Sequence, residues 1–231
     1  MEQIYRDEYH ELERKNPWFI ARRELVLSLM GDVPSDACIL DAGCGTGFLL
    51  DVLKGRGFSR VFGVEASASF LRSEWAVAGH GECLPLKDGL FDVVFCLDVL
   101  EHVDSDNLMA SELLRVLKPG GRLIVTVPAL HLLWSYHDEL CHHRRRYDAR
   151  MLRNTLRAFD MERMSYWNFF LFLPILCMKF VKRKVAESSD FVPLPAPLRA
   201  LALALFRIEN WLVKRMRLPW GVSIVAVVKK E

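Results

Sequence analysis

Apolar runs alternate with segments of helical periodicity over the first half of this chain. The apolar runs predict strands at 37–41, 60–65, 75–78, 91–97 and 122–127. The periodic segments predict helices at 46–55, 67–73 and 106–117. Because the predicted strands are apolar throughout, helices are expected to cover both faces of a parallel sheet. The alternation therefore predicts an α/β fold with a Rossmann-like, doubly wound sheet.

Further elements flank this alternation. Residues 1–30 predict one or two helices with a break at Asn16-Pro17. Beyond the fifth strand we expect a helix capped by Asp148, a strand at 164–167, an amphipathic helix at 198–217 and a closing strand at 221–228.

The first predicted strand ends in an acid and a turn with glycine at every second position, Gly43, Gly45 and Gly47. Glycine permits positive φ and lets a ligand lie against the backbone, whose N–H groups then face that ligand. The spacing GxGxG departs from the GxGxxG of a dinucleotide fingerprint. Ligands of doubly wound sheets bind beyond the carboxyl ends of the strands, where Asp41 and Glu65 stand.

Four ordered stretches resemble the class I S-adenosylmethionine-dependent methyltransferases. They are ILDAGCGTGFLL (39–50), VFGVEAS (61–67), GECLPLKDGLFDVVFCLDVLEHV (81–103) and LLRVLKPGGRLIVTVP (113–128). The resemblance implies a seven-stranded, mostly parallel sheet with an antiparallel last strand at its edge, and a helical insertion before that strand. It also implies S-adenosyl-L-methionine as the cofactor and methyl transfer as the reaction.

The resemblance further implies roles for the residues of the glycine turn. Gly43, Gly45 and Gly47 would accommodate the methionine part and the ribose of the cofactor. Asp41 would lie near the methionyl amino group, and Glu65 would hold the ribose diol.

The third and fourth strands are expected to supply the adenine side of the site. Gly81 and Glu82 would border the adenine edge, and Leu97 with Asp98 would line the sulfonium and adenine side. His80 stands where the family usually has an acid. Backbone groups or the His80 ring would therefore have to replace the usual carboxylate contact to the adenine amino group.

A segment rich in histidine and arginine follows the last central strand. Residues 134–148 resemble a WSxHD…HHxRRY segment of one bacterial subgroup of these enzymes. We expect a lid over the methyl-donor pocket, with His137 and His143 as general-base candidates and Arg145 and Arg146 as anion-binding groups for the acceptor. A solvated basic loop is the alternative. The segment has metal-ligating residue types, but its spacing fits no standard site, so no metal is expected.

The expected organisation is one domain over residues 1–231. Its parts are an N-terminal helical cap (1–35), the nucleoside-binding core and lid (36–168), an apolar and basic helical appendage (169–218) and the closing strand (219–231).

The appendage combines apolar and basic residues. Residues 163–217 hold ten Lys/Arg against three Asp/Glu, although the net charge of the chain is only +2. The apolar run 169–181 is shorter than the roughly 20 residues of a membrane-spanning helix and is followed by Lys182-Arg183-Lys184. Either it packs as core, or it lies in a membrane interface and is attracted to anionic lipid.

Helix 198–217 is expected to be amphipathic, with an apolar face and a polar, largely basic face. The apolar face comprises Leu201, Leu205, Ile208, Leu212 and Met216. The polar face comprises Arg199, Arg207, Asn210, Lys214 and Arg217.

Composition limits the partners and the compartment. Six scattered cysteines without a CxxC pair favour reduced thiols in the cytoplasm, with attachment to the inner membrane face as an alternative. Residues outside 163–217 are net acidic, and the chain has no NPPY-type signature of base methylation, so no nucleic-acid partner is expected. The acceptor is expected to be a small molecule or a lipid-linked one. A non-catalytic S-adenosylmethionine-binding regulator and a nicotinamide-dependent oxidoreductase are the rival functions.

Overall fold

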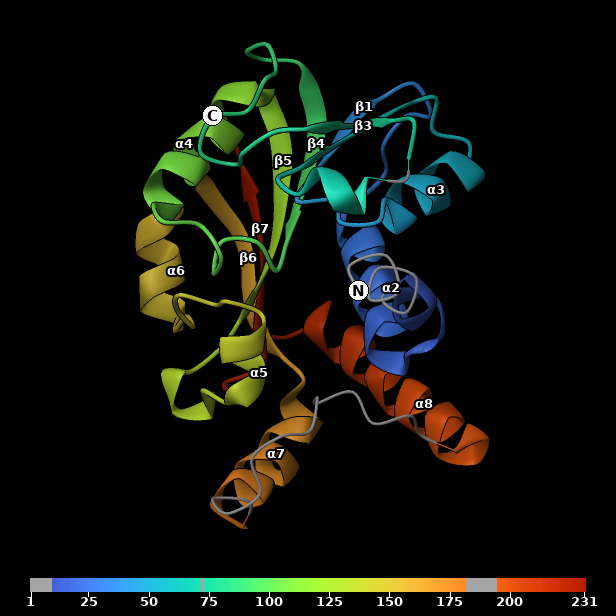
Figure 1. Cartoon of the computed structure of the whole chain (residues 1–231), viewed down its shortest axis with the longest axis vertical. Coiled ribbons are helices and arrows are strands. Elements are labelled where there is room, and N and C mark those ends of the chain that lie inside the picture. Colours follow the sequence, from blue (N-terminus) through green and yellow to red (C-terminus); the bar gives the residue numbers. More distant parts are fainter. Residues whose placement is uncertain (1–9, 72, 182–194) are drawn as a thin grey trace.

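The computed structural model describes residues 10–71, 73–181 and 195–231. Seven strands form one sheet in the order β3-β2-β1-β4-β5-β7-β6 (Figure 1). Strands β1 to β5 pair in parallel, and β7 runs antiparallel to both β5 and β6. The predicted Rossmann-like architecture with an antiparallel last strand is confirmed. The last strand is not at the edge, however, because it inserts between β5 and β6.

The strands are β1 (Cys38–Ala42), β2 (Arg60–Glu65), β3 (Ala76–Ala78), β4 (Phe91–Leu97), β5 (Leu117–Pro128), β6 (Asp160–Trp167) and β7 (Ser223–Lys229). The α-helices are α2 (Pro17–Leu29), α3 (Phe48–Gly55), α4 (Asp106–Val116), α5 (Tyr136–Leu140), α6 (Ala149–Thr155), α7 (Phe169–Val181) and α8 (Ala196–Val213). Two short 3-10 helices are η1 (Ala68–Phe70) and η2 (His131–Leu133).

The predicted helix at 67–73 is wrong, because the described residues of that segment form only the three-residue η1. The Ser67 amide donates to the Glu65 carboxylate, and the Ser67 and Ser69 hydroxyls bond each other at 2.7 Å. Such local side-chain bonds compete with helix formation. The predicted break at Asn16-Pro17 is confirmed, since the Asn16 side chain caps α2 by accepting from the Trp18 amide at 2.8 Å.

Alternate residues of the central strands face two separate apolar layers. Cys38 and Leu40 of β1 pack in the layer formed with α4 and α6, whereas Ile39 packs in the layer formed with α2 and α3. All three side chains are fully buried. Helices therefore cover both faces of the sheet, which leaves the carboxyl ends of the parallel strands as the edge open to a ligand.

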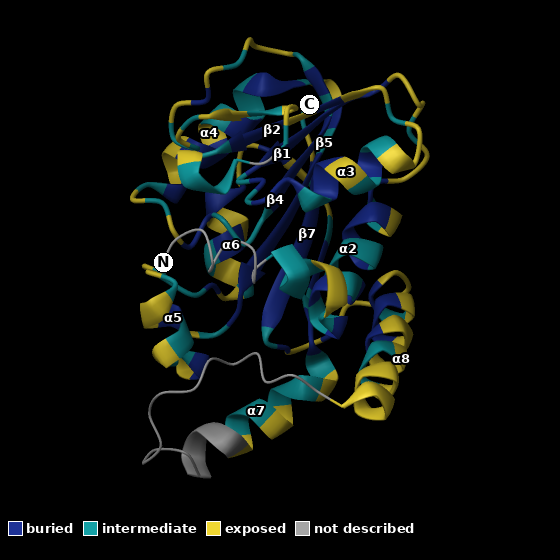
Figure 2. Ribbon diagram, turned by 45° about the vertical axis from the view of Figure 1, so that its right-hand side comes forward, coloured by how far each residue is buried: buried dark blue, intermediate teal, exposed yellow. Residues whose placement is uncertain are grey.

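Helix α8 packs against α2, and the contact includes a residue of its predicted polar face (Figure 2). Asn210, expected on the polar face, is buried and bridges Trp167 Nε1 and the Ala21 carbonyl at 2.9 Å each. Glu209 is buried as well, and its carboxylate accepts from the Phe169 amide at 2.7 Å, at the start of α7. Buried polar groups are tolerated here because each has a hydrogen-bond partner.

The apolar face that the sequence predicted for α8 is largely exposed to solvent. Leu201, Leu205 and Ile208 are 57%, 43% and 53% exposed. The basic run Lys182-Arg183-Lys184, which was predicted to adjoin this appendage, lies outside the described residues. Within the described ranges, every helix falls short of the length and apolarity needed to cross a membrane.

Candidate active site

The turn after β1 is built for close approach of a ligand. Gly43 has φ +84°, and a Cβ there would lie 2.3 Å from Val99 Cγ2. Gly45 has φ +52°, and a Cβ there would meet no described atom within 4 Å, so space is open above it. Gly47 also has a left-handed backbone conformation and is the N-cap residue that precedes α3. No side chain among the described residues caps this end of the helix. Open space above the turn and uncapped N–H groups suit a polar ligand.

Glu65 at the end of β2 holds this turn. One carboxylate oxygen, Oε2, accepts from the Gly45 amide at 2.9 Å, and Oε1 accepts from the Ser67 amide at 3.0 Å. The carboxylate is thus fixed beside Gly45, at the place where the sequence predicted the ribose diol.

Asp41 is the deepest acid of the site. It is 4% exposed, and its Oδ1 has no hydrogen-bond partner among the described residues. The pKa of Asp41 is raised to about 7, mainly by burial; Arg22 opposes this shift, and the Glu13 and Glu65 carboxylates add to it. A buried carboxyl oxygen without a donor costs free energy, so a cationic or N–H group of a ligand would fit there.

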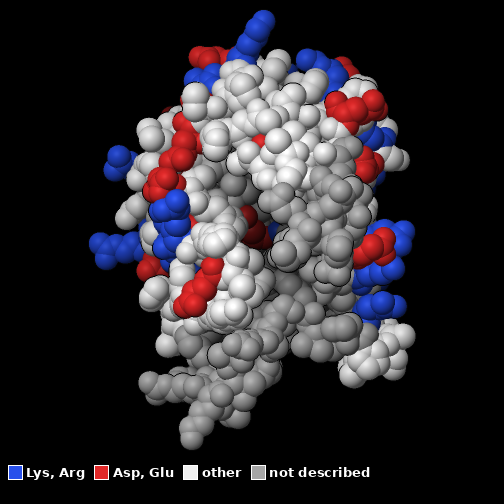
Figure 3. All heavy atoms as spheres, in the orientation of Figure 1, with Lys and Arg blue, Asp and Glu red and all other residues white. Residues whose placement is uncertain are grey.

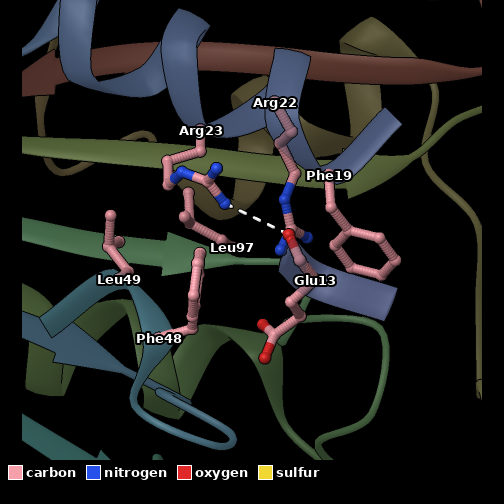
Figure 4. Close-up of a pocket in the computed structure, with 7 residues that line it drawn as sticks. All are labelled: Glu13, Phe19, Arg22, Arg23, Phe48, Leu49 and Leu97. Carbon is pink, nitrogen blue, oxygen red and sulfur yellow. Dashed lines mark hydrogen bonds between the residues drawn. The ribbon is translucent and has the colours of Figure 1, made fainter. Parts of the chain in front are cut away.

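The described part of the N-terminal segment contacts the glycine turn. Residues 10–15 are helical, and Glu13 accepts a hydrogen bond from the Thr46 hydroxyl of the turn. Arg23 donates to the Glu13 carbonyl at 3.2 Å, and its guanidinium lies 4.7 Å from the centre of the Phe48 ring. Figure 4 shows these side chains converging on a pocket. Its lining comprises Glu13, Phe19, Arg22, Arg23, Phe48, Leu49 and Leu97.

Arg22 joins the cap to the end of β4. Its guanidinium donates to the Asp98 carboxylate, and it lies over the ring of Trp18 at 4.9 Å and that of Phe19 at 5.1 Å. Asp98 has φ +55°, which places it in the left-handed region unusual for a residue other than glycine. The end of β4 therefore combines an anchored acid with a cation that faces the pocket.

The predicted adenine border is held by α4. Glu82 Oε1 accepts from the Ser105 amide at 2.6 Å, and a Cβ on Gly81 would lie 2.8 Å from Met109 Sδ. His80 bridges to Cys83 across a short turn. Backbone and side-chain contacts thus fix this turn beside the strand ends, and its contact with adenine stays a prediction.

The histidine- and arginine-rich segment is organised around Asp138 of α5. Asp138 is fully buried and accepts from His143 Nδ1 at 2.8 Å and from Arg146 at 2.8 and 2.9 Å. Burial alone would raise its pKa, but the hydrogen bonds from His143 and Arg146 hold the pKa of Asp138 well below its usual range. The charged carboxylate fixes the ring of His143, whereas the His137 ring lies 3.5 Å from Cys141 Sγ.

The two arginines predicted to bind an anion have protein partners in this structure. Arg146 is 8% exposed at its side chain and holds Asp138. Arg145 donates to the carbonyls of Val103 and Asp104 at 3.0 and 2.9 Å. Their role toward the acceptor stays a prediction, since an anion would have to displace these contacts.

The same segment lies along the loop that follows β4. The Arg144 amide donates to the Glu101 carbonyl at 2.8 Å, and the rings of His102 and His143 meet edge to face at 4.7 Å. Sequence reasoning gave no role to Glu101. Glu101 and His102 stand side by side just beyond a predicted strand, which is a signal for a functional site. The apolar residues around them, however, favour a structural role in packing.

Comparisons with known proteins agree with this geometry. Residues 40–125 match the family described as a methyltransferase domain. A protein of Mycolicibacterium smegmatis described as "Probable S-adenosylmethionine-dependent methyltransferase" is 34% identical over 124 residues, which cover 51% of this chain and 48% of that protein. A malonyl-[acyl-carrier protein] O-methyltransferase of Herminiimonas arsenicoxydans is 36% identical over 126 residues, with the same coverage of 51% and 48%.

A solved structure has the same fold. The geranyl diphosphate C-methyltransferase from Streptomyces coelicolor A3(2), in complex with Mg²⁺, geranyl diphosphate and S-adenosyl-L-homocysteine, has a TM-score of 0.65. It is 17% identical and covers 96% of this chain and 80% of its own.

The strand order, the glycine turn and the family match define residues 40–125 as a class I methyltransferase domain. S-adenosyl-L-methionine is the cofactor of this domain. The chain spans about half the length of the two curated relatives described above. The matched residues end at 125, so the resemblance of residues 134–148 to a bacterial subgroup stays a prediction.

Proposed function

We propose that the whole chain, acting as one catalytic unit, transfers the methyl group of S-adenosyl-L-methionine to a hydroxyl group of a small-molecule or lipid-linked acceptor. The observation that carries this proposal is the pair formed by His143 and buried Asp138 beside the loop that follows β4. The cofactor supplies a methyl group on a sulfonium. The protein must position the acceptor and take its proton.

A hydroxyl is a poor nucleophile until it loses its proton, so a base accelerates its methylation. Asp138 accepts from His143 Nδ1, which leaves Nε2 to take a proton. His137 is the second candidate, and its ring lies 3.5 Å from Cys141 Sγ. The O-methyltransferase named above is consistent with an oxygen acceptor.

The other predicted site residues would bind the cofactor. Glu65 would accept from the ribose hydroxyls, Asp41 would face the methionyl ammonium, and Gly81, Glu82 and Leu97 would border the nucleoside. The open space at Gly45 and the unpartnered Asp41 oxygen support this assignment.

The exposed stripe on α8 supports a lipid-linked acceptor over a fully soluble one. We define the α8 stripe as Leu198, Leu201, Leu205 and Ile208, which are 43–57% exposed and spaced three or four residues apart. Lys214, Arg215 and Arg217 follow it and are exposed. An apolar stripe with adjoining basic groups matches an element that rests on an anionic membrane surface. Over the described residues of the face in Figure 3, acidic and basic side chains are mixed, without the broad basic field typical of nucleic-acid binding.

The test is to incubate the protein with S-adenosyl-L-methionine carrying a labelled methyl group and with extract separated into aqueous and lipid fractions. We expect label in the lipid fraction, in an oxygen-linked methyl group. Label on nitrogen or carbon would contradict the hydroxyl acceptor. S-adenosyl-L-methionine binding without transfer to any fraction would favour a regulatory protein.

A further inference from the structure

Three side chains with metal-ligating atoms meet beside the lid. One ligand atom from each of Glu101, His102 and His143 lies within 4.8 Å of the other two. The first two follow β4, and the third comes from the segment after α5. Backbone bonding holds the two segments together, because the Arg144 amide donates to the Glu101 carbonyl and Arg144 Nε donates to the His102 carbonyl at 3.0 Å.

Glu101 is an unexplained buried acid. The residue is 0% exposed, and neither carboxylate oxygen has a hydrogen-bond partner among the residues that the structure describes. A buried carboxylate without hydrogen-bond donors is strongly destabilising. Proteins keep such a group where a proton or a cation satisfies it.

His143 is already oriented in the way that metal ligands are. A histidine that binds a metal through one ring nitrogen usually donates its other N–H to a carboxylate, which fixes the ring and raises its basicity. Here Nδ1 contacts Asp138 at 2.8 Å, and Asp138 is itself held by Arg146 and by the Ser135 amide at 2.7 Å. The remaining nitrogen, Nε2, is the ligand atom available to an ion.

We propose that Glu101, His102 and His143 form a binding site for one divalent transition-metal ion, such as Zn²⁺ or Mn²⁺. Two imidazoles and one carboxylate suit such ions better than Mg²⁺, which prefers oxygen ligands. Metal–ligand bonds of about 2.0–2.2 Å place ligand atoms about 3–3.5 Å apart, so a separation at the 4.8 Å limit would have to shorten by about 1–2 Å when the ion binds. Three protein ligands leave a further coordination position open.

The consequence for catalysis rests on the proposed function, whereas ion binding does not. An acceptor hydroxyl in the open position would lose its proton to solvent more readily, because a bound cation lowers its pKa. The resulting oxygen anion would take the methyl group from the sulfonium. In the ion-bound protein, His143 Nε2 would serve as a metal ligand. In the ion-free protein, the same nitrogen would serve as the base.

The test measures metal binding directly and without cofactor. The protein is stripped with a chelator and titrated with Co²⁺, whose visible absorption reports nitrogen and oxygen ligands, and then with Zn²⁺ in a calorimeter. We expect one equivalent to bind. Glu101→Gln, His102→Ala and His143→Ala should each weaken binding at least tenfold, and Asp138→Asn by about ten- to a hundred-fold through the orientation of His143.

His142→Asn is the matched control, because His142 is the exposed neighbour of His143 and asparagine tolerates its φ of +55°. It should bind the ion as the wild type does. Binding of S-adenosyl-L-homocysteine shows that each variant is folded. His102 is solvent-exposed, so His102→Ala is the substitution least able to disturb folding. No Co²⁺ absorption at millimolar ion, or equal affinity in the wild type and the three ligand variants, would overturn the site.

Discussion

The Arg22 guanidinium donates to the carboxylate of Asp98, which joins helix α2 to the end of strand β4 across 76 residues of sequence. The two side chains are 13% and 21% exposed, so the pair is largely shielded from solvent. Because Arg22 also lines the pocket, this ion pair connects α2 and the end of β4 at the pocket wall.

Arg22→Gln should weaken S-adenosyl-L-homocysteine binding about ten- to a hundred-fold, because a cation at the pocket would pair with the ligand carboxylate. Adenosine lacks that carboxylate and should bind nearly unchanged. Calorimetry measures the affinity of the variant for each ligand. The control is Arg207→Gln, which removes an arginine from an exposed ion pair with Glu24. Equal losses for both ligands would mean that Arg22 acts only by shaping the pocket.

Glu65→Ala should weaken S-adenosyl-L-homocysteine binding by about 1.5–3 kcal/mol, because two ribose hydroxyls lose a charged acceptor. Loss of the bond to the Gly45 amide should add to the effect by loosening the turn. The exposed acid Glu74 provides the control substitution. Unchanged affinity in a folded Glu65→Ala protein would remove this residue from the site.

The elevated pKa of Asp41 makes stability depend on pH. Between pH 4 and 7 the folded protein keeps the Asp41 proton and the unfolded chain does not, so stability falls as pH rises through this window. A shift of about three units corresponds to at most about 4 kcal/mol. Asp41→Asn carries no charge, so its stability relative to the wild type should grow from pH 4 to 7 and then level off.

Urea denaturation of the ligand-free protein at several pH values measures this difference. Asp51→Asn, at an exposed position on α3, serves as the control and should show no such trend. A stability difference between Asp41→Asn and the wild type that stays constant from pH 4 to 8 would be incompatible with the raised pKa.

His143→Ala should lower kcat by roughly 10²–10⁴-fold with cofactor affinity nearly kept, since it removes the proton acceptor. Asp138→Asn should lower kcat through the orientation of the same ring. His137→Ala should have the smaller effect, because the buried Asp138 carboxylate orients the ring of His143. Single-turnover rates separate this step from product release. Equal rates in all four proteins would leave positioning as the whole mechanism and disfavour a hydroxyl acceptor.

Replacing Leu201 and Leu205 of the α8 stripe by Ser should release the protein from vesicles that contain anionic lipid, because both side chains are exposed and apolar. Replacing Lys214, Arg215 and Arg217 by Gln should weaken binding by about 1 kcal/mol per charge, and high salt should act in the same direction. Lys87→Gln, at an exposed loop position, is the charge control. A wild-type protein that stays unbound in flotation at low salt would exclude the membrane surface.

The sequence alone determined the elements whose signals are local. Buried strands such as Cys38–Ala42 are continuous apolar runs, and the caps Asn16 and Asp148 act on amides two or three residues away. The strand ends carrying Asp41 and Glu65 followed from the same pattern, because parallel strands bring their carboxyl ends to one edge.

The tertiary structure decided what depends on contacts between distant segments. The periodicity of α8 revealed an apolar face, but Asn210 is buried and Leu201 exposed because α2 and Trp167 supply partners for the amide. Likewise Glu101 and His143 are 42 residues apart, and only the packing of residues 134–148 on the loop after β4 brings them together. Hydrogen-bond partners and burial are set by the assembled chain, so no local pattern could encode them.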